Sequence, residues 1–572
     1  MAPLQTARER EEGEGSWGER LIKKSKREEE MKHMNRREAL KNSLAGSALA
    51  LAGSQYANQA VASAAVEASP VVETQYGKVR GATVRGVHIF KGVPYGGKTE
   101  GAARFLPPAK PEKWTGVREV TKTMPRCVQG PTVRELRIWD GAYNRGFSGR
   151  EEEVREPESE NCLALNVLTP GLKGKRPVMV YIHGGGFAIL SPVITQFADG
   201  LPRDEDVVLV GVSHRLNVFG YLYLGGLSEK YAVGNPGQLD LILALEWVRD
   251  NIAQFGGDPE NVMVFGESGG GAKISALLGM PGAKGLFHRA VVESGSIMRV
   301  HDADEATRMA KVLLMTCGLG RNQISELQKV PAAKLYEGSM AVAQPMIGFG
   351  PVVDGHSLPQ QPWDPKAPEI SADIPMIIGC CKDEPAEWCM PDDFLFSLDA
   401  AGLRDRIVKG GIPEAEVDPL LAAYRRDHPE ESPTDFYMRI TTDRGFRWWA
   451  IKQAELKAEQ GKGNVYMYYF AWDTPVTYAG HRFKAFHGAE LPLTMRNVLY
   501  PESDPLSRQI SGAWAAFARS GNPNHAGLPE WPAYTLAERA TMVFDLGKSR
   551  VVNDPDGEER RMLRDRLSSR LA

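Results

Sequence analysis

Cysteine is scarce in this sequence. Six cysteines occur among 572 residues, and none form the spaced pairs that are typical of zinc sites. No apolar run reaches the roughly 20 residues that a membrane-spanning helix needs, and no internal repeat period is found. The formal net charge is only −3, which gives no basis for binding nucleic acid or another highly charged polymer. We therefore expect no metal ion, no cofactor, no nucleic-acid partner and no stable membrane insertion.

The first 64 residues differ from the rest. Residues 1–33 are charged and lack apolar periodicity, which predicts a disordered extension. Arg36 and Arg37 then precede a mildly apolar stretch and the small residues Ala62-Ser63-Ala64, in the order of a signal peptide with its cleavage site. This order predicts a twin-arginine signal, a mature chain that begins near Ala65, and a periplasmic or secreted protein. An amphipathic or disordered tail is the alternative.

Residues 65–572 carry the pattern of one α/β domain with a mostly parallel sheet and helices on both faces. Alternating segments bounded by glycines predict an antiparallel meander at the start, and later runs that are apolar on both faces predict buried parallel strands. The strands are expected at 71–74, 77–81, 87–92, 177–183, 206–213, 262–265, 289–293, 374–380 and 465–470, with a helix over 237–255. Two long helical stretches, 300–345 and 391–458, are expected to be cap insertions that cover the site.

The stretch Phe265-Gly266-Glu267-Ser268-Gly269-Gly270-Gly271 joins a β-branched run to a small-residue segment that favours a helix. Strand, sharp turn and helix around G-x-S-x-G are typical of a nucleophile elbow, although the motif alone also occurs by chance in glycine-rich loops. The turn forces strained angles on Ser268, and a Cβ at the flanking glycines would clash. The motif predicts a serine hydroxyl at the carboxyl edge of the sheet, with the N–H of Gly269 aimed at the same point.

A catalytic serine needs a base within hydrogen-bond reach, and the base needs an orienting acid. In the α/β-hydrolase order of serine, acid and histidine, Asp383 and Glu384 are the candidate acids, because they leave the expected strand at 374–380. Two histidines, His481 and His487, follow the next strand. A surface histidine in a loop is the ordinary interpretation, and it still fits His481.

Donors for an oxyanion are also required, and His183-Gly184-Gly185-Gly186-Phe187 supplies them at the end of a buried strand. Consecutive glycines let bare N–H groups approach a substrate oxygen. A phosphate-binding loop is the competing interpretation, but no Gly-Lys-Ser/Thr follows.

Several motifs now point the same way. They are HGGGF at 183–187, the segments at 234–240 and 251–259, Gly-Glu-Ser at 266–268 and Ser-Gly-Asn-Pro-Asn at 520–524. Together they resemble the type B carboxylesterase family, which contains carboxylesterases, bacterial para-nitrobenzyl esterases and cholinesterases. The resemblance extends from about Val71 to beyond Tyr534.

The resemblance implies an α/β-hydrolase fold and a role for each matching residue. Ser268 matches the nucleophile, His487 the general base and acid, and Glu384 the orienting acid. The positions of the oxyanion hole are matched by Gly185, Gly186 and Gly269.

Two departures from the family pattern affect the expected site. Gly269 replaces an alanine, which keeps the N–H but predicts a looser backbone. Pro385 replaces a glycine and is expected to restrict Glu384 to extended angles. A carboxylate aimed elsewhere would leave Asp383 as the alternative acid.

The cysteines extend the resemblance. Cys127 and Cys162 match the family's first disulfide, which fits an oxidising compartment. Cys317 matches half of a second bridge, but Glu326 stands at the partner position, so Cys317 is expected to be unpaired. The remaining cysteines, Cys380, Cys381 and Cys389, are expected to pack at a strand end rather than to bind a metal.

The pocket predictions concern two aromatic residues. Trp139, inside the loop that the first bridge would close, is a candidate for the mouth of the pocket. Its context differs from that of the cholinesterase aromatic, so choline esters are not expected. Phe349 is a candidate for the acyl side, or a core residue.

The sequence therefore predicts a serine carboxylic-ester hydrolase that acts on a small to medium neutral ester through an acyl-enzyme. One alternative is a non-catalytic, cholinesterase-like binding or adhesion module. Another is an amide or carbamate hydrolase that uses the same triad. The sequence predicts no oligomeric state.

Overall fold

The protein is described by a computed structural model that covers residues 66–130, 156–342, 348–389, 392–478 and 480–567. Contacts group residues 65–572 into one compact unit. The predicted leader at 1–64 and the candidate pocket residue Trp139 lie outside the described residues.

A sheet of 13 strands organises this unit, in the order β1-β2-β3-β5-β7-β6-β8-β9-β12-β13-β16-β17, with β4 paired to β2. Strands β7, β6, β8, β9, β12, β13 and β16 form a parallel run. The strands at both ends of the sheet pair antiparallel, except that β4 is parallel to β2. Each predicted strand is present, and the predicted α/β-hydrolase fold is confirmed.

The strands of this sheet have the following bounds: β1 Glu67–Glu73, β2 Lys78–Val84, β3 Val87–Pro94, β4 Val117–Glu119, β5 Ala164–Thr169, β6 Arg176–Ile182, β7 Val208–Val212, β8 Gly257–Glu267, β9 Arg289–Glu293, β12 Met376–Cys381, β13 Val465–Phe470, β16 Ala540–Phe544 and β17 Arg550–Asn553. Two short ladders pair β10 His301–Asp302 with β11 Val352–Val353, and β14 Thr477–Tyr478 with β15 His481–Arg482. The helices are α3 Gly200–Glu205, α4 Asn217–Tyr221, α5 Pro236–Asn251, α6 Gly269–Leu277, α7 Ala303–Thr316, α8 Ala332–Val342, α9 Ala400–Lys409, α10 Glu414–Asp427, α11 Pro433–Arg444, α12 Phe446–Gln460, α13 Leu491–Thr494, α14 Asp504–Ser520 and α15 Gly557–Leu567.

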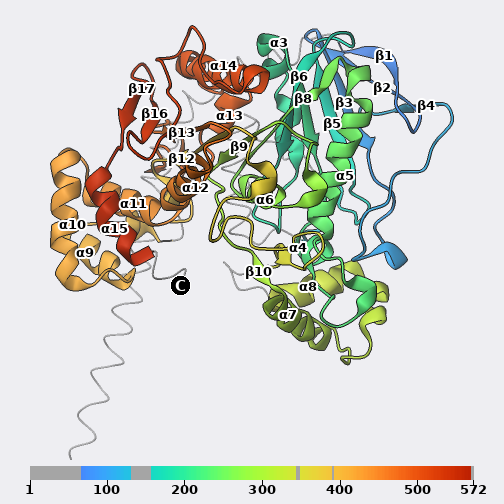
Figure 1. Ribbon diagram of the computed structural model, residues 1–572, viewed down its shortest axis with the longest axis horizontal. Helices are drawn as coiled ribbons and strands as arrows, with labels where there is room; N and C mark the ends of the chain where they lie inside the picture. Colours follow the sequence, from blue (N-terminus) through green and yellow to red (C-terminus); the bar gives the residue numbers. More distant parts are fainter. Residues whose placement is uncertain (1–65, 131–155, 343–347, 390–391, 479, 568–572) are drawn as a thin grey trace, which may run out of the picture. The chain divides into compact units, whose positions relative to one another are not determined.

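The parallel strands are apolar on both faces because both faces are covered. Side chains alternate across a strand, and in β6 Val178 and Val180 join one core while Met179 and Tyr181 join the other. The first core also receives side chains from α5, α6 and α12, and the second from α3 and α14. The sheet is therefore sandwiched between two helical layers (Figure 1).

The predicted cap insertions are helical, with one correction. The stretch 300–345 contains α7 and α8, which pack on each other. Helices α9, α10 and α11 gather with α15 around a small core of their own (Figure 1). The last helix of the second stretch, α12, is not a cap, because its alanines pack against β12 and β13 in the first core.

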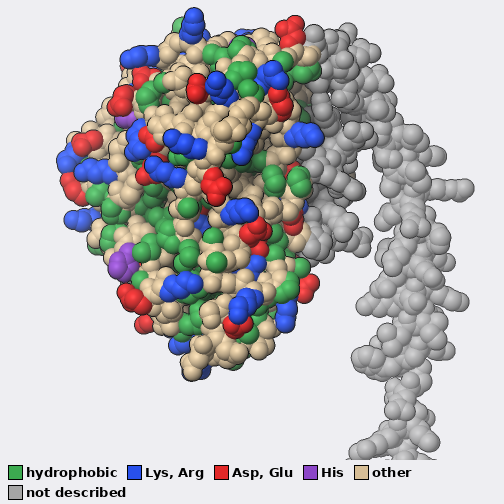
Figure 2. All heavy atoms as spheres, turned by 90° about the vertical axis from the view of Figure 1, so that its right-hand side faces the viewer, with side chains coloured by type: hydrophobic (Ala, Val, Ile, Leu, Met, Phe, Trp, Pro, Cys, Tyr) green, Lys and Arg blue, Asp and Glu red, His purple; other side chains and the backbone are tan. Residues whose placement is uncertain are grey.

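The distribution of charged side chains on the surface is consistent with the small net charge. On the face shown in Figure 2, basic and acidic side chains are interspersed. None of the helices in the described ranges has the length and apolar character needed to cross a membrane.

Candidate active site

Ser268 lies between β8 and α6, at the carboxyl end of a central parallel strand. Its backbone angles are φ 56° and ψ −123°, a region that residues other than glycine rarely adopt. The surroundings hold this conformation, since the N–H of Ser268 donates to the carbonyl of Glu293 at 2.8 Å. Strain at such a position is typical of a functional residue.

The glycines on either side of Ser268 are required by close contacts. A Cβ at Gly266 would lie 2.4 Å from the carbonyl oxygen of Ile182, and one at Gly270 would lie 2.0 Å from the same oxygen. Backbone atoms cannot yield as a flexible side chain can. The elbow therefore packs directly on the end of β6, as the G-x-S-x-G motif predicts.

His487 and Glu384 meet at the same edge of the sheet. Glu384 follows β12, His487 follows β13, and His487 Nδ1 contacts a carboxylate oxygen of Glu384, with both side chains buried. The other carboxylate oxygen of Glu384 accepts from Ser294 Oγ at 2.6 Å and from the N–H of Cys381 at 2.7 Å. The carboxylate is therefore fixed on one side and bound to the imidazole on the other.

Pro385 does not have the expected effect. Glu384 is the first residue of a 3-10 turn, Glu384–Ala386, rather than an extended residue. Its N–H donates to Thr442 Oγ1 at 3.1 Å, which ties the turn to α11. The prediction of an extended Glu384 is wrong, and its carboxylate reaches His487.

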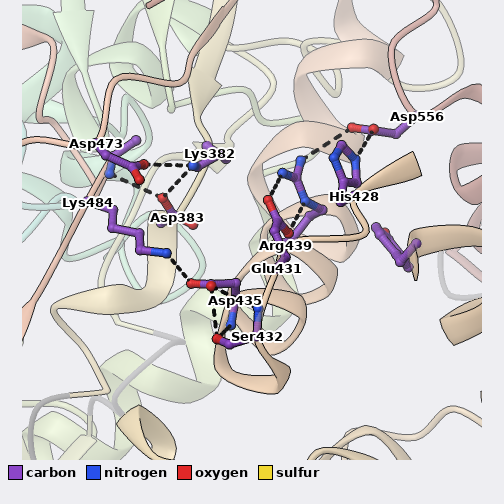
Figure 3. Close-up of polar contacts among 12 residues, drawn as sticks. Lys382, Asp383, His428, Glu431, Ser432, Asp435, Arg439, Asp473, Lys484 and Asp556 are labelled. Atoms are coloured by element: carbon purple, nitrogen blue, oxygen red, sulfur yellow. Dashed lines mark hydrogen bonds and ion pairs between the residues drawn. The ribbon is translucent and has the colours of Figure 1, made fainter. Parts of the chain in front are cut away.

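Asp383 and His481, the alternative acid and histidine, have other partners. Asp383 faces Lys382, whose Nζ lies 3.7 Å away, and accepts from the N–H of Ala485 at 3.2 Å (Figure 3). It thus ties the acid turn to the segment that carries His487. His481 is partly exposed, and its Nε2 lies 3.1 Å from the carboxylate of Asp393. The structure brings neither of them to the Glu384 carboxylate.

The HGGGF segment leaves β6 beside the elbow. Gly185 and Gly186 have φ values of 77° and 58°, which favour glycine. A Cβ at Gly269 would lie 2.1 Å from the carbonyl oxygen of Gly186 and 2.4 Å from its nitrogen. This glycine is buried, begins α6, and lets the Gly-rich loop pack directly on the elbow, while the looser backbone at Gly269 stays a prediction.

Glu267, the residue before the nucleophile, is a buried carboxylate beside the histidine. Its Oε1 lies 3.0 Å from His487 Nε2, but neither atom has an aligned hydrogen-bond partner in the described part of the chain. Burial raises the pKa of Glu267 to about 8. Burial alone would lower the pKa of His487, but the carboxylates of Glu267 and Glu384 outweigh it and raise this pKa to about 10. Glu267 therefore loses its proton at a lower pH than His487 does, and its charge acts on the imidazole where His487 titrates.

We expect Glu267→Gln to shift the acid limb of the kcat/KM profile to lower pH, by about one unit. The imidazole must be neutral to accept a proton. Removing a carboxylate that favours the imidazolium lowers the pKa of His487, so the neutral form appears at lower pH. The pH dependence of para-nitrophenyl butyrate hydrolysis measures this shift.

Glu293→Gln is the matched control for this measurement. Glu293 is also fully buried, but its carboxylate accepts from Trp514 Nε1 at 2.7 Å and forms no ion pair with His487 among the described residues, so this variant is expected to leave the acid limb in place. An unmoved limb in Glu267→Gln would contradict the prediction, because Glu267 would then be protonated in the working enzyme.

Sequence reasoning missed two aromatic residues at the histidine. The ring centroids of Trp388 and Phe446 lie 4.7 Å and 4.8 Å from that of His487. Trp388 is 45% exposed, which is unusual for tryptophan. Its place four residues after Glu384, in the acid loop, is the signal that could have identified it.

The remaining predicted residues have these positions. Phe349 is buried in the first core, and its role at the acyl side stays a prediction. Cys127 and Cys162 are both buried free thiols, and the neighbouring Cys127 and burial raise the pKa of the Cys162 thiol well above its usual value. In the described ranges, no group of three or more metal-ligating side chains is placed to hold an ion.

The chain is similar to known esterases over most of its length. A model of the carboxylesterase family matches residues 68–562. The para-nitrobenzyl esterase of Bacillus subtilis (strain 168) is 34% identical over 512 residues, which cover 86% of this chain and 98% of that protein. The liver carboxylesterase of Sus scrofa is 32% identical over 518 residues, covering 82% and 88% of the two chains.

Solved structures agree with these sequences. A carboxylesterase of Geobacillus stearothermophilus has a TM-score of 0.72 at 36% identity, and the match covers 86% of this chain and 100% of that one. An esterase of Clostridium hathewayi has a TM-score of 0.73 at 31% identity, covering 88% and 100%. The elbow, the Gly-rich loop and the Glu384–His487 pair all lie inside the matched region.

Proposed function

Because this chain belongs to the carboxylesterase family and is a carboxylic ester hydrolase, we propose that Ser268, His487 and Glu384 form its catalytic triad. The contact between His487 Nδ1 and Glu384 carries this proposal. It fixes the proton on Nδ1 and leaves Nε2, buried and without an aligned hydrogen bond in the described ranges, as the base. Nε2 takes the proton of Ser268 Oγ as that oxygen attacks the ester carbonyl carbon.

The carbonyl oxygen then becomes an anion, which the N–H groups of Gly185, Gly186 and Gly269 stabilise. His487 gives its proton to the departing alcohol and leaves an acyl group on Ser268. A water molecule that loses its proton to His487 then attacks this acyl group. As the bond to Ser268 Oγ breaks, His487 returns the proton to that oxygen and the acid is released.

The decisive experiment is pre-steady-state hydrolysis of para-nitrophenyl acetate and butyrate by the intact protein. An acyl-enzyme predicts a burst of para-nitrophenol that is stoichiometric with enzyme. A fluorophosphonate should label the peptide that contains Ser268 and remove the burst. A folded protein with neither burst nor labelling would overturn the proposed triad.

We propose a neutral ester of small to medium size as the substrate. Trp388 and Phe446 offer apolar contact beside the catalytic base, and the buried carboxylates nearby disfavour an anionic substrate. Amide or carbamate hydrolysis would use the same triad. The binding-module alternative is not favoured, because serine, acid, histidine and the glycine donors are all present.

We also propose that the protein is exported and that Cys127 and Cys162 become a disulfide after export. The paired arginines and small residues before Ala65 support export. The bridge is supported by the burial of both thiols and by the proximity through which Cys127 raises the pKa of Cys162. Protein recovered from the periplasm should have both cysteines protected from alkylation. Protein from a host without the twin-arginine translocase should stay in the cytoplasm with both thiols free, and equal processing in the two hosts would contradict the export route.

A further inference from the structure

Lys273 is a fully buried lysine that the catalytic cycle described above does not use. It lies on α6, five residues after the nucleophile, and has no exposed surface. Burial lowers the pKa of its ammonium well below the usual value. No carboxylate in the described part of the chain forms an ion pair with it. Burying a lysine without an anionic partner costs free energy of folding, so its hydrogen bonds must offset that cost.

Those contacts are with the Gly-rich loop. Lys273 Nζ donates to the carbonyl oxygen of His183 at 2.8 Å and lies 3.4 Å from that of Gly184. The carbonyl of Gly184 also faces His183 Nδ1 at 3.0 Å. Burial and the neighbouring Lys273 lower the pKa of His183 well below its usual value, so this imidazole is neutral. The side chains of Lys273 and His183 therefore both contact carbonyl oxygens of the Gly-rich loop.

The carbonyl of Gly184 and the N–H of Gly185 belong to one planar peptide unit. In a trans peptide the two bonds point in opposite directions. A donor on the carbonyl therefore fixes the direction of the N–H on the other side, and it strengthens that N–H as a donor, since linked hydrogen bonds polarise one another. That N–H is the one that Gly185 presents to the oxyanion.

From this geometry we infer that Lys273 is a positioning residue of the oxyanion hole, which acts on the substrate oxygen through the Gly184–Gly185 peptide. The inference rests on the proposed function. It explains why a long polar side chain lies in a helix that is otherwise built of small and apolar residues, Gly269–Leu277. Either protonation state of the amine can donate to the two carbonyls.

The test compares Lys273→Met with the wild-type enzyme. Methionine keeps the length of the side chain but has no donor. We expect kcat to fall by about 10- to 100-fold and KM to stay nearly unchanged. The fall should not exceed that caused by removing a whole oxyanion donor, which lowers kcat by about 10²- to 10³-fold. The affinity for an alkyl trifluoromethyl ketone, which forms a tetrahedral oxyanion on Ser268, should fall by the same factor. Affinity for the matching secondary alcohol, which forms no oxyanion, should not change.

Lys457→Met is the matched control. Lys457 is another buried lysine whose Nζ donates to carbonyl oxygens, those of Ala372 at 2.6 Å and Ser371 at 3.2 Å. These carbonyls lie before the amino end of β12, whereas the site lies at its carboxyl end. This variant should lose stability but keep both kcat and the affinity for the ketone.

Lys273→Gln, which keeps a donor, should lie between Lys273→Met and wild type, and it decides the question if Lys273→Met does not fold. Equal ketone affinity in wild type and the Lys273 variants, or a loss confined to KM, would overturn the inference while the proposed function stands. A wild-type enzyme without a burst and without ketone binding would overturn both.

Discussion

Ser268→Ala is expected to abolish the para-nitrophenol burst and to lower kcat by about 10⁶-fold. The change removes only the attacking oxygen. The oxyanion donors and His487 remain, so a slow hydrolysis above the uncatalysed rate should persist. Alanine keeps the Cβ and therefore the same backbone strain, so the melting temperature should stay close to that of wild type. Burst kinetics and calorimetry on the same preparation measure both expectations.

Ser275→Ala is the control for this variant. Ser275 is a buried serine of α6, and its hydroxyl donates to the carbonyl of Gly271 at 2.9 Å within the helix. Its kcat should be near that of wild type. A burst that survives in Ser268→Ala would contradict the assignment of the nucleophile.

Glu384→Gln is expected to lower kcat by about 10³- to 10⁴-fold. A neutral amide cannot stabilise the imidazolium that forms during attack. Its NH₂ group can also donate to Nδ1, which would place the ring proton on Nε2, where it blocks the base. Steady-state kinetics over a range of pH measures the effect. The loss should persist at high pH, because the tautomer and not the protonation of the base limits the rate.

Asp383→Asn separates the two candidate acids. Asp383 is the adjacent residue, also buried, and faces Lys382 and the segment before His487 (Figure 3). We expect a loss of less than about tenfold, through altered positioning of that segment. If Asp383→Asn were the more damaging of the two, the role assigned to Glu384 would be wrong.

The central sheet could be predicted from the sequence because its signal is local. Runs such as Val178–Ile182 and Val262–Phe265 are apolar at every position, and only a strand covered on both faces needs that pattern. The strands β16 and β17 were not predicted. Strand β16 pairs with β13, which lies far away in the sequence, and β17 in turn pairs with β16.

The site residues that belong to a sequence motif could be predicted, and those outside the motifs were harder to predict. Ser268 and the Gly-rich loop carry sequence signals of their own. The effect of Pro385 was misjudged, because the usual restriction on the residue before proline is outweighed here by the contacts that hold Glu384. The role of Lys273 could not be predicted, because the sequence does not show whether a single lysine is exposed to solvent or contacts the carbonyl oxygens of a buried loop.

The backbone of Ser268 also bears on how such a chain evolves. A serine at φ 56° and ψ −123° costs about 1–3 kcal/mol, and glycine at this position would relieve most of that cost. Selection for turnover is what retains the serine. In a descendant freed from that selection, Ser268→Gly would remove the nucleophile and increase stability, so this first step from hydrolase to inactive relative would be thermodynamically downhill.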